Sequence, residues 1–100
     1  MRRFMVVERF RPGAMAAAYE RFETKGRLLP DGLHYVDSWL AAEAETCFQL
    51  MRTEDPTLFP IWFARWEDLV EFELHEIEKR AARFTSKTEA ASQPIRRHRP

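Results

Sequence analysis

The chain has 100 residues, of which 45% are hydrophobic and 13% aromatic, and its formal net charge is zero. This composition is typical of one globular domain, because disordered chains lack the aromatic side chains that offset the entropy of ordering. The charge is uneven: residues 86–100 carry four basic side chains and one acidic one, so the first 85 residues carry −3. A mildly acidic body argues against nucleic-acid binding, which needs a clustered basic face.

Cysteine usage and hydropathy indicate the compartment. Cys47 is the single cysteine, so the chain has no internal disulfide and no sign of secretion. Only four consecutive apolar residues, at positions 4–7, precede Glu8, too few for the apolar region of a signal peptide. No stretch approaches the roughly 20 apolar residues of a membrane helix. We therefore expect a soluble cytoplasmic protein without membrane contacts.

The first half of the chain predicts a strand, a helix and a hairpin. Residues 3–10 are rich in β-branched and aromatic side chains and stop at Arg11-Pro12-Gly13, a turn signal. Residues 14–27 are strong helix formers that end near Gly26. Residues 33–41 and 46–53 read as two strands joined by a short hairpin at 42–45. The helix carries one apolar stripe, formed by Met15, Ala18, Tyr19 and Phe22.

The second half predicts a helix and a last strand. Asp55 is the expected N-cap, with Pro56 at the first helical position. Pro60 lacks an N–H four residues further in, so we expect an irregular first turn that restarts near Pro60 and a helix that runs to about Asp68. Residues 69–77 alternate strictly between apolar and polar, as a strand does. Residues 78–84 suggest a short helix, and residues 85–100 a disordered basic tail.

The element order is β-α-β-β-α-β, which predicts an α+β, ferredoxin-like fold over residues 1–84. In this fold a four-stranded antiparallel sheet carries both helices on one face. Strand alternation then assigns side chains to the two faces of the sheet. The first strand can be read either way, although pairing of Arg9 with Glu71 or Glu73 favours Arg9 on the face away from the helices.

The other three strands have definite assignments. We expect seven side chains toward the helices: Val36, Leu40, Phe48, Leu50, Val70, Phe72 and Leu74. We expect the opposite face to hold Leu33, Tyr35, Asp37, Trp39, Cys47, Gln49, Met51, Glu71, Glu73, His75 and Ile77. Soluble monomers seldom expose so much apolar surface. The prediction is a homodimer in which two sheets pack face to face around a twofold axis.

Three segments carry a resemblance to a known family: "RFMVVERFRPG" at 3–13, "DSWLAAEAETCFQLMRTEDP" at 37–56 and "WFARWEDLVEFELHEI" at 62–77. The chain resembles a bacterial family catalogued as domain of unknown function 3303, in the dimeric α/β-barrel superfamily. It departs from the family where a glycine-rich hairpin is replaced by residues 42–45. The resemblance implies the dimeric α/β barrel and no established activity. The superfamily includes cofactor-independent monooxygenases, haem-degrading enzymes, isomerases and ligand-binding modules, so fold analogy says little about function.

Few residue patterns indicate chemistry. Glu73 and His75 share one strand face, but a metal site needs three or four converging ligands, so we expect none. His75 is the candidate general base, whereas His34 fits an exposed strand end. Cys47 reads as a small packing residue rather than a nucleophile. No glycine-rich phosphate loop is present, which argues against a nucleotide cofactor, and we expect no cofactor.

The aromatic residues fall into two groups. Trp62, Phe63 and Trp66 form a broad helical stripe, whose simplest role is in the core. Trp39 lies on a strand face where lining a cleft and anchoring a dimer are equally compatible with the pattern.

The favoured function is a homodimer that binds a small apolar or aromatic molecule in a cavity between sheet and helices. The expected pocket residues are Tyr35, Trp39, Glu73, His75 and Arg52, with Arg52 available for an acid group. One alternative is a cofactor-independent monooxygenase or isomerase that uses His75 as its base. Another is an interaction module whose second sheet face serves only to dimerise.

Overall fold

A computed structural model of the chain describes residues 1–42 and 45–79. The elements follow the predicted order βαββαβ, and the sheet is four-stranded and antiparallel with strand order β2-β3-β1-β4. The prediction of a ferredoxin-like α+β fold is therefore confirmed. The elements are β1 (Arg2–Phe10), α1 (Met15–Lys25), β2 (His34–Leu40), β3 (Thr46–Thr53), α2 (Leu58–Ala64) and β4 (Val70–Ile77).

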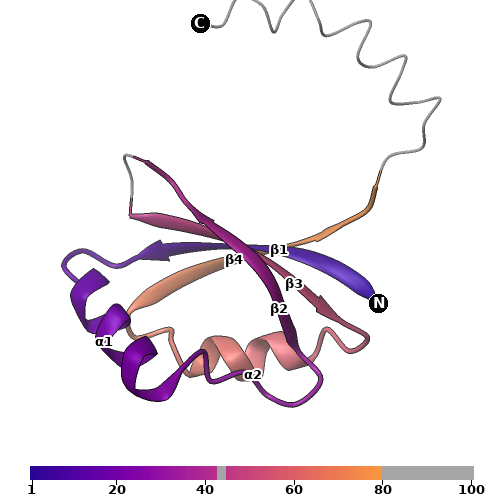
Figure 1. Cartoon of the computed structure of the whole chain (residues 1–100), viewed down its shortest axis with the longest axis horizontal. Helices are drawn as coiled ribbons and strands as arrows, with labels where there is room; N and C mark the ends of the chain where they lie inside the picture. The colour runs from indigo at the N-terminus through magenta and orange to yellow at the C-terminus, as the bar shows by residue number, and fades with distance from the viewer. Residues whose placement is uncertain (43–44, 80–100) are drawn as a thin grey trace, which may run out of the picture.

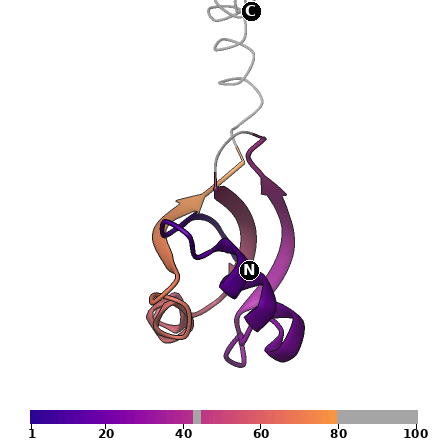
Figure 2. The same cartoon turned by 90° about the vertical axis from the view of Figure 1, so that its left-hand side faces the viewer.

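Both helices lie below the sheet in Figure 1, and within residues 1–42 and 45–79 no helix covers its other face. Seen end-on in Figure 2, the sheet curls around the two helices, so its concave side is the one they cover. We call the opposite, convex side the outer face. No helix in residues 1–42 and 45–79 has both the length and the apolar run needed to cross a membrane.

The central strand β1 sets the faces of the whole sheet. It pairs with β3 along one edge and with β4 along the other, and its register places Val6 opposite Gln49 and Leu74. Directly opposed residues point to the same side of a sheet. Phe4, Val6 and Glu8 are buried on the helix side, while Arg9 lies on the outer face and its Nη1 donates to Glu73 Oε1 over 2.8 Å. The pairing expected for Arg9 is thus observed.

The face assignment of β3 is opposite to the prediction. Gln49, Met51 and Thr53 are buried toward the helices, whereas Phe48 and Leu50 lie on the outer face. Cys47 is opposite Glu8 and therefore also faces the helices. Both alternating sets of β3 contain large side chains, so hydrophobicity alone did not distinguish them.

In and next to strand β2, three more residues lie differently from the predicted face of the sheet. Leu33 is buried in the core and Tyr35 packs against it, although both were expected on the outer face. The register between β2 and β3 shifts between Tyr35 and Asp37, and this irregularity leaves Val36 exposed instead of facing the helices. Because the bulge adds one residue, Trp39 still lies on the outer face, as expected.

The core forms where the helices meet the sheet. Trp62 and Phe59 of α2 are 2% and 0% exposed, so the interpretation of the aromatic stripe as core is correct. Phe63 stacks on Phe72 of β4 with ring centroids 4.2 Å apart and planes 13° from parallel. Such offset pairs add to the stabilisation from buried area. The buried cluster consists of Phe4, Val6, Ala18, Leu33, Met51, Phe59, Trp62 and Trp66.

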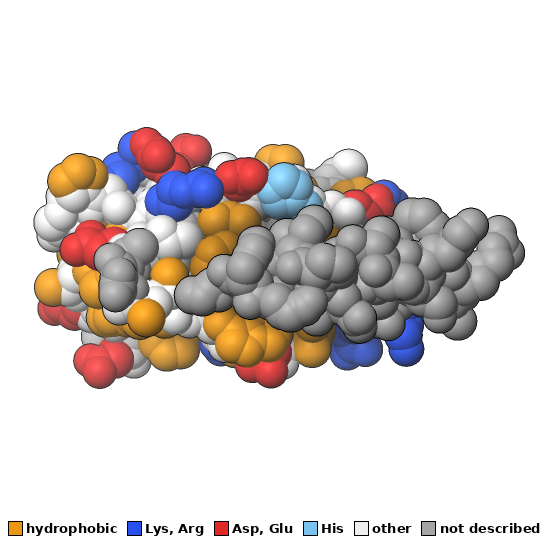
Figure 3. Space-filling view, turned by 90° about the horizontal axis from the view of Figure 1, so that it is seen from above, with side chains coloured by type: hydrophobic (Ala, Val, Ile, Leu, Met, Phe, Trp, Pro, Cys, Tyr) orange, Lys and Arg blue, Asp and Glu red, His pale blue; other side chains and the backbone are white. Residues whose placement is uncertain are grey.

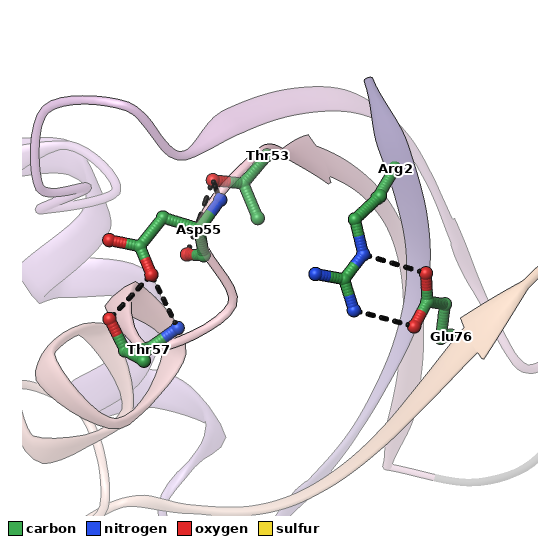
Figure 4. A network of polar contacts seen from close by, with 5 residues as sticks. All are labelled: Arg2, Thr53, Asp55, Thr57 and Glu76. Atoms are coloured by element: carbon green, nitrogen blue, oxygen red, sulfur yellow. Dashed lines mark hydrogen bonds and ion pairs between the residues drawn. The ribbon is translucent and has the colours of Figure 1, made fainter.

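Helix α2 is shorter than predicted and begins differently. It runs without a restart at Pro60, and its N-cap is Thr57 rather than Asp55. Asp55 instead accepts hydrogen bonds from the backbone N–H and the hydroxyl of Thr57, at 3.0 and 2.5 Å (Figure 4). Pro60 is the third helical residue, where its missing N–H removes no helical bond. Turns replace the helix from residue 65 to 69.

Polar side-chain contacts stabilise two places near the ends of strands, one at Thr53 and one between Arg2 and Glu76 (Figure 4). The fully buried Thr53 hydroxyl donates to the Gly32 carbonyl over 2.7 Å and accepts from the Asp55 N–H over 3.0 Å. Arg2 of β1 forms two hydrogen bonds with Glu76 of β4, at 2.8 and 2.9 Å. Residues 78 and 79 are not helical, and the remainder of the predicted last helix, the basic tail and the centre of the hairpin lie outside the described residues.

Candidate functional site

A cavity of about 240 Å³ lies between the concave side of the sheet and the helices. Every described element contributes residues to its wall. The sheet curls around the two helices (Figure 2), which brings its four strands to one common side. Its lining combines aromatic side chains with a few polar groups, as small-molecule sites do. The lining residues are Glu8, Phe10, Ala18, Tyr19, Phe22, Arg27, Ser38, Gln49, Trp62, Trp66 and Val70.

The polar end of the cavity is built on β1 and β3. Glu8 is 9% exposed and Gln49 is 8% exposed, and the Gln49 side-chain N–H donates a hydrogen bond to Glu8 Oε2. Burial raises the pKa of the Glu8 carboxyl to about 7, against the opposing effects of this hydrogen bond and of the charge on Arg27. Gln49 Oε1 is buried and has no hydrogen-bond partner among the described residues. Buried polar atoms in proteins are nearly always paired, so this end of the cavity is incomplete.

Arg27 forms another part of the wall, in the segment between α1 and β2. Its guanidinium carbon lies 3.4 Å from the ring centroid of Tyr35 and 5.1 Å from that of Phe22. Its backbone carbonyl accepts two indole N–H groups, from Trp62 over 2.8 Å and from Trp66 over 2.9 Å. The backbone of this segment is thus tied to α2, and the side chain is held against aromatic rings.

The mouth of the cavity is aromatic as well. Tyr19 and Phe22 belong to the apolar stripe of α1, yet they are 46% and 42% exposed. Both line the cavity, and Tyr19 contacts Phe10 with ring centroids 6.0 Å apart. Arg21, from the same helix, binds Asp68 at 2.7 and 2.9 Å and holds α1 against the turn after α2. Within the stripe, Ala18 is therefore part of the core, whereas Tyr19 and Phe22 border an opening.

Cys47 lies beside Glu8 in the register but has no nucleophilic character. Burial, and after it the charge of Glu8, raise the pKa of the thiol to about 11. A thiol in this state is neutral near pH 7, and the neutral form is the unreactive one. Its interpretation as a packing residue agrees with these surroundings.

Four of the residues expected to form a pocket lie on the outer face, where Trp39, Glu73 and His75 were expected. Trp39 is on the edge strand β2, whereas Glu73 and His75 are on the opposite edge strand β4, with β3 and β1 between them. Arg52 lies beside His34 and Arg3 near one end of the face. None of the four lines the cavity between sheet and helices. The structure separates Trp39 from His75 by the width of the sheet.

Tyr35, the fifth expected residue, lies next to the cavity on the concave side. Its hydroxyl is 2.7 Å from the hydroxyl of Ser38, which lines the cavity, and its ring lies against Arg27. Tyr35 thus supports the wall of the cavity without forming it.

Glu73 and His75 form a charged cluster with Arg9 at one edge of the outer face. His75 Nε2 is 2.5 Å from Glu73 Oε2, and the other carboxylate oxygen of Glu73 accepts from Arg9. These hydrogen bonds lower the pKa of Glu73, that from Arg9 most. All three side chains are exposed, and Figure 3 shows His, acidic and basic side chains together along this edge. Among the described residues no three His, Cys, Asp or Glu side chains are arranged to hold a metal ion.

The middle of the outer face is apolar. Met5 and Val7 of β1 lie directly opposite Leu50 and Phe48 of β3, and Trp39 of β2 lies beside Phe48. Phe48 and Trp39 are 36% and 51% exposed. Figure 3 shows hydrophobic side chains on this face next to the charged edge. We call these five residues the outer apolar patch.

Sequence reasoning missed Glu8, Gln49 and Arg27 as site residues. A signal for Glu8 was present: once Arg9 points outward, Glu8 falls between Val6 and Phe10 on the helix side. Gln49 follows only from the correct face of β3, which its own alternation did not decide. No local pattern marks Arg27, because its role depends on contacts with residues far along the chain.

Comparison with protein families gives one match. The family model described as "Domain of unknown function (DUF3303)" matches residues 2–82, which include all six described elements. Comparisons with curated proteins and with solved structures found no match.

Proposed function

The chain belongs to the DUF3303 family of domains of unknown function, and we propose that it binds a small apolar or aromatic molecule in the cavity between the sheet and the helices. One observation carries the proposal: the cavity has aromatic walls and ends at the buried Glu8–Gln49 pair, whose hydrogen bonding is incomplete. Its volume of about 240 Å³ is below the roughly 300–1,000 Å³ of sites for drug-sized ligands, which favours a small molecule.

Filling the cavity tests this proposal. Ala18 lines the cavity and is 3% exposed, whereas its neighbour Ala17 is exposed on the same helix. We expect the Ala18→Phe variant to lose binding of small aromatic compounds in saturation-transfer NMR, and the matched Ala17→Phe variant to retain it. Equal binding by both folded variants would place the ligand elsewhere. Native mass spectrometry of the purified protein would in addition report a ligand retained from the host.

A second proposal concerns assembly, and the outer apolar patch supports it. On this face, which no described helix covers, Phe48 and Trp39 are exposed, Met5 and Leu50 are half-buried, and Val7 between them is buried. Such an apolar patch is unusual for a soluble monomer. We propose that two copies pack through this patch as a homodimer. Light scattering during gel filtration should then give twice the chain mass of 11.9 kDa. A single-chain mass at micromolar concentration would refute the dimer but not the ligand cavity.

A further inference from the structure

Two polar groups face the cavity without forming an ion pair with each other. Glu8 and Arg27 both line it, and Arg27 lowers the pKa of Glu8 through its charge, yet no nitrogen of Arg27 is within 4.0 Å of a Glu8 oxygen. Oppositely charged groups in a shared low-dielectric space normally approach each other. Here aromatic contacts hold Arg27 where it is, so the two groups border a space that a ligand can bridge.

The Arg27 guanidinium is prepared for an anion. Its carbon lies 3.4 Å from the centroid of the Tyr35 ring, so the ring covers one side of the guanidinium and leaves the N–H groups at its edge. Among the described residues no acceptor receives a hydrogen bond from these N–H groups, whereas Arg2, Arg9, Arg11, Arg21 and Arg65 all have one. Arg3 and Arg52 also lack an acceptor among the described residues, but both are exposed to solvent and do not line the cavity. A planar fork of unused donors fits a carboxylate with two parallel hydrogen bonds.

The end of the cavity formed by Glu8 also favours a negatively charged ligand group. With its pKa near 7, Glu8 is largely neutral in slightly acidic solution, and a bound anion favours the neutral form further. The titratable groups around it are Arg27, Tyr19 of α1 and Cys47 of β3, while β4 contributes the apolar Phe72 and Val70. A proton on Glu8 gives the carboxyl one hydrogen-bond donor for a bound carboxylate, a donor that the ionised form lacks.

The remaining wall suits an aromatic ring. The indole N–H groups of Trp62 and Trp66 are both used by the Arg27 carbonyl, so these two side chains offer the ligand only carbon surface. Phe10, Phe22 and Tyr19 add aromatic surface around the same space.

We propose, on the basis of the function proposed above, that the ligand is a small aromatic carboxylic acid whose carboxylate lies between the Arg27 guanidinium and the Glu8 carboxyl. The binding reaction takes up a proton when Glu8 starts ionised, because Glu8 is neutral in the complex. The ring lies against Trp62 and Trp66.

Three compounds with the same ring and different head groups test the charge: cinnamate, cinnamyl alcohol and cinnamylamine. The titration uses a Trp39→Phe background, because Trp39 lies on the outer face and the two remaining tryptophans line the cavity. We expect cinnamate to quench their fluorescence with a Kd at least about tenfold lower than that of the alcohol, the ratio expected for charge-assisted hydrogen bonds. The amine should bind more weakly still, since Arg27 repels it.

Two variants and a control test the residues. Arg27→Gln should raise the Kd of cinnamate to that of the alcohol, whereas Arg3→Gln, on the outer face, should leave it unchanged. If circular dichroism shows that Arg27→Gln does not fold, Arg27→Lys keeps the charge but loses the planar fork and should still weaken cinnamate. Glu8→Gln should abolish the weakening of cinnamate binding that raising the pH from 6 to 8.5 causes in the wild type.

The outcomes separate the two proposals. Alcohol or amine binding as tightly as cinnamate, or a wild-type affinity that is independent of pH, would overturn the aromatic acid while leaving the cavity as a ligand site. If none of the three compounds binds, and Ala18→Phe changes nothing in the saturation-transfer experiment, the cavity proposal is overturned as well. Calorimetry in phosphate and in Tris should show net proton uptake near neutral pH, and its absence would contradict the role of Glu8.

Discussion

Replacing Glu8 by Gln tests the electrostatic description of the cavity without any ligand. Gln keeps the size of the side chain and its ability to pair with Gln49, but it removes the titration. In the folded protein the pKa of Glu8 is raised from its ordinary 4.5 to about 7, mainly by burial. The folded state therefore holds the Glu8 proton more tightly than the unfolded state, and the resulting stability is complete below about pH 4.5 and is lost as the pH rises to 7.

The size of the effect follows from the same pKa. A rise from 4.5 to about 7 corresponds to about 3 kcal/mol in total, of which about 2 kcal/mol is lost between pH 5.5 and pH 8.5. The exposed acids with lowered pKa, Asp55, Asp68, Glu73 and Glu76, act in the opposite direction at lower pH, so this window isolates Glu8.

Urea denaturation followed by circular dichroism measures the free energy of unfolding across this window. We expect the wild type to lose about 2 kcal/mol between pH 5.5 and pH 8.5, and Glu8→Gln to lose much less. The matched control is Glu71→Gln, an exposed carboxyl on the outer face, which should keep the wild-type pH dependence. If Glu8→Gln also kept it, Glu8 would not be the buried acid that the structure describes.

Three further predictions address the buried hydrogen bond of Thr53, the reactivity of Cys47 and the role of Trp39 on the outer face. Thr53→Val should lower the free energy of unfolding by about 1–3 kcal/mol in urea titrations, because it leaves the Gly32 carbonyl without its buried donor; an unchanged midpoint would show that this hydrogen bond is replaceable. Cys47 should react with iodoacetamide at least about tenfold faster in urea than in the folded protein at pH 7.5, since burial keeps the thiol neutral; equal rates would contradict its burial. Trp39→Ser should shift the mass in light scattering from two chains toward one, whereas Ile61→Ser, equally exposed on α2, should not; a dimer that tolerates the loss of Trp39 would not use this patch.

The fold was predictable because its signals are local. The β-branched run before Arg11-Pro12-Gly13, the strong helix formers of α1 and the alternation of β4 from Val70 to His75 each specify an element within about ten residues. Their order then leaves few ways of assembling a sheet. The end of α2 was placed four residues too late, since the turn at 65–69 depends on tertiary contacts such as that of Arg21 with the Arg65 carbonyl.

The site was less predictable because it depends on which residues face one another. In β3 the sequence Cys-Phe-Gln-Leu-Met offers large side chains on both faces, and Phe48 and Leu50 are the more hydrophobic set. The structure nevertheless buries Gln49, whose side chain donates a hydrogen bond to Glu8 of the neighbouring strand β1. A polar pair buried together overrides hydrophobic alternation, and neither member shows this when its strand is read alone.

Two tryptophans of the cavity wall bind the same backbone carbonyl, which limits how far this wall depends on the side chain at that position. The indole N–H groups of Trp62 and Trp66, their only polar side-chain atoms, both donate to the backbone carbonyl of Arg27. Any residue at position 27 would provide this carbonyl. These two hydrogen bonds therefore do not depend on which side chain is present at position 27. Under the proposed function, a substitution there, or at position 8 on β1, changes the charge that the cavity presents to a ligand, while the carbonyl that both indoles bind stays in place.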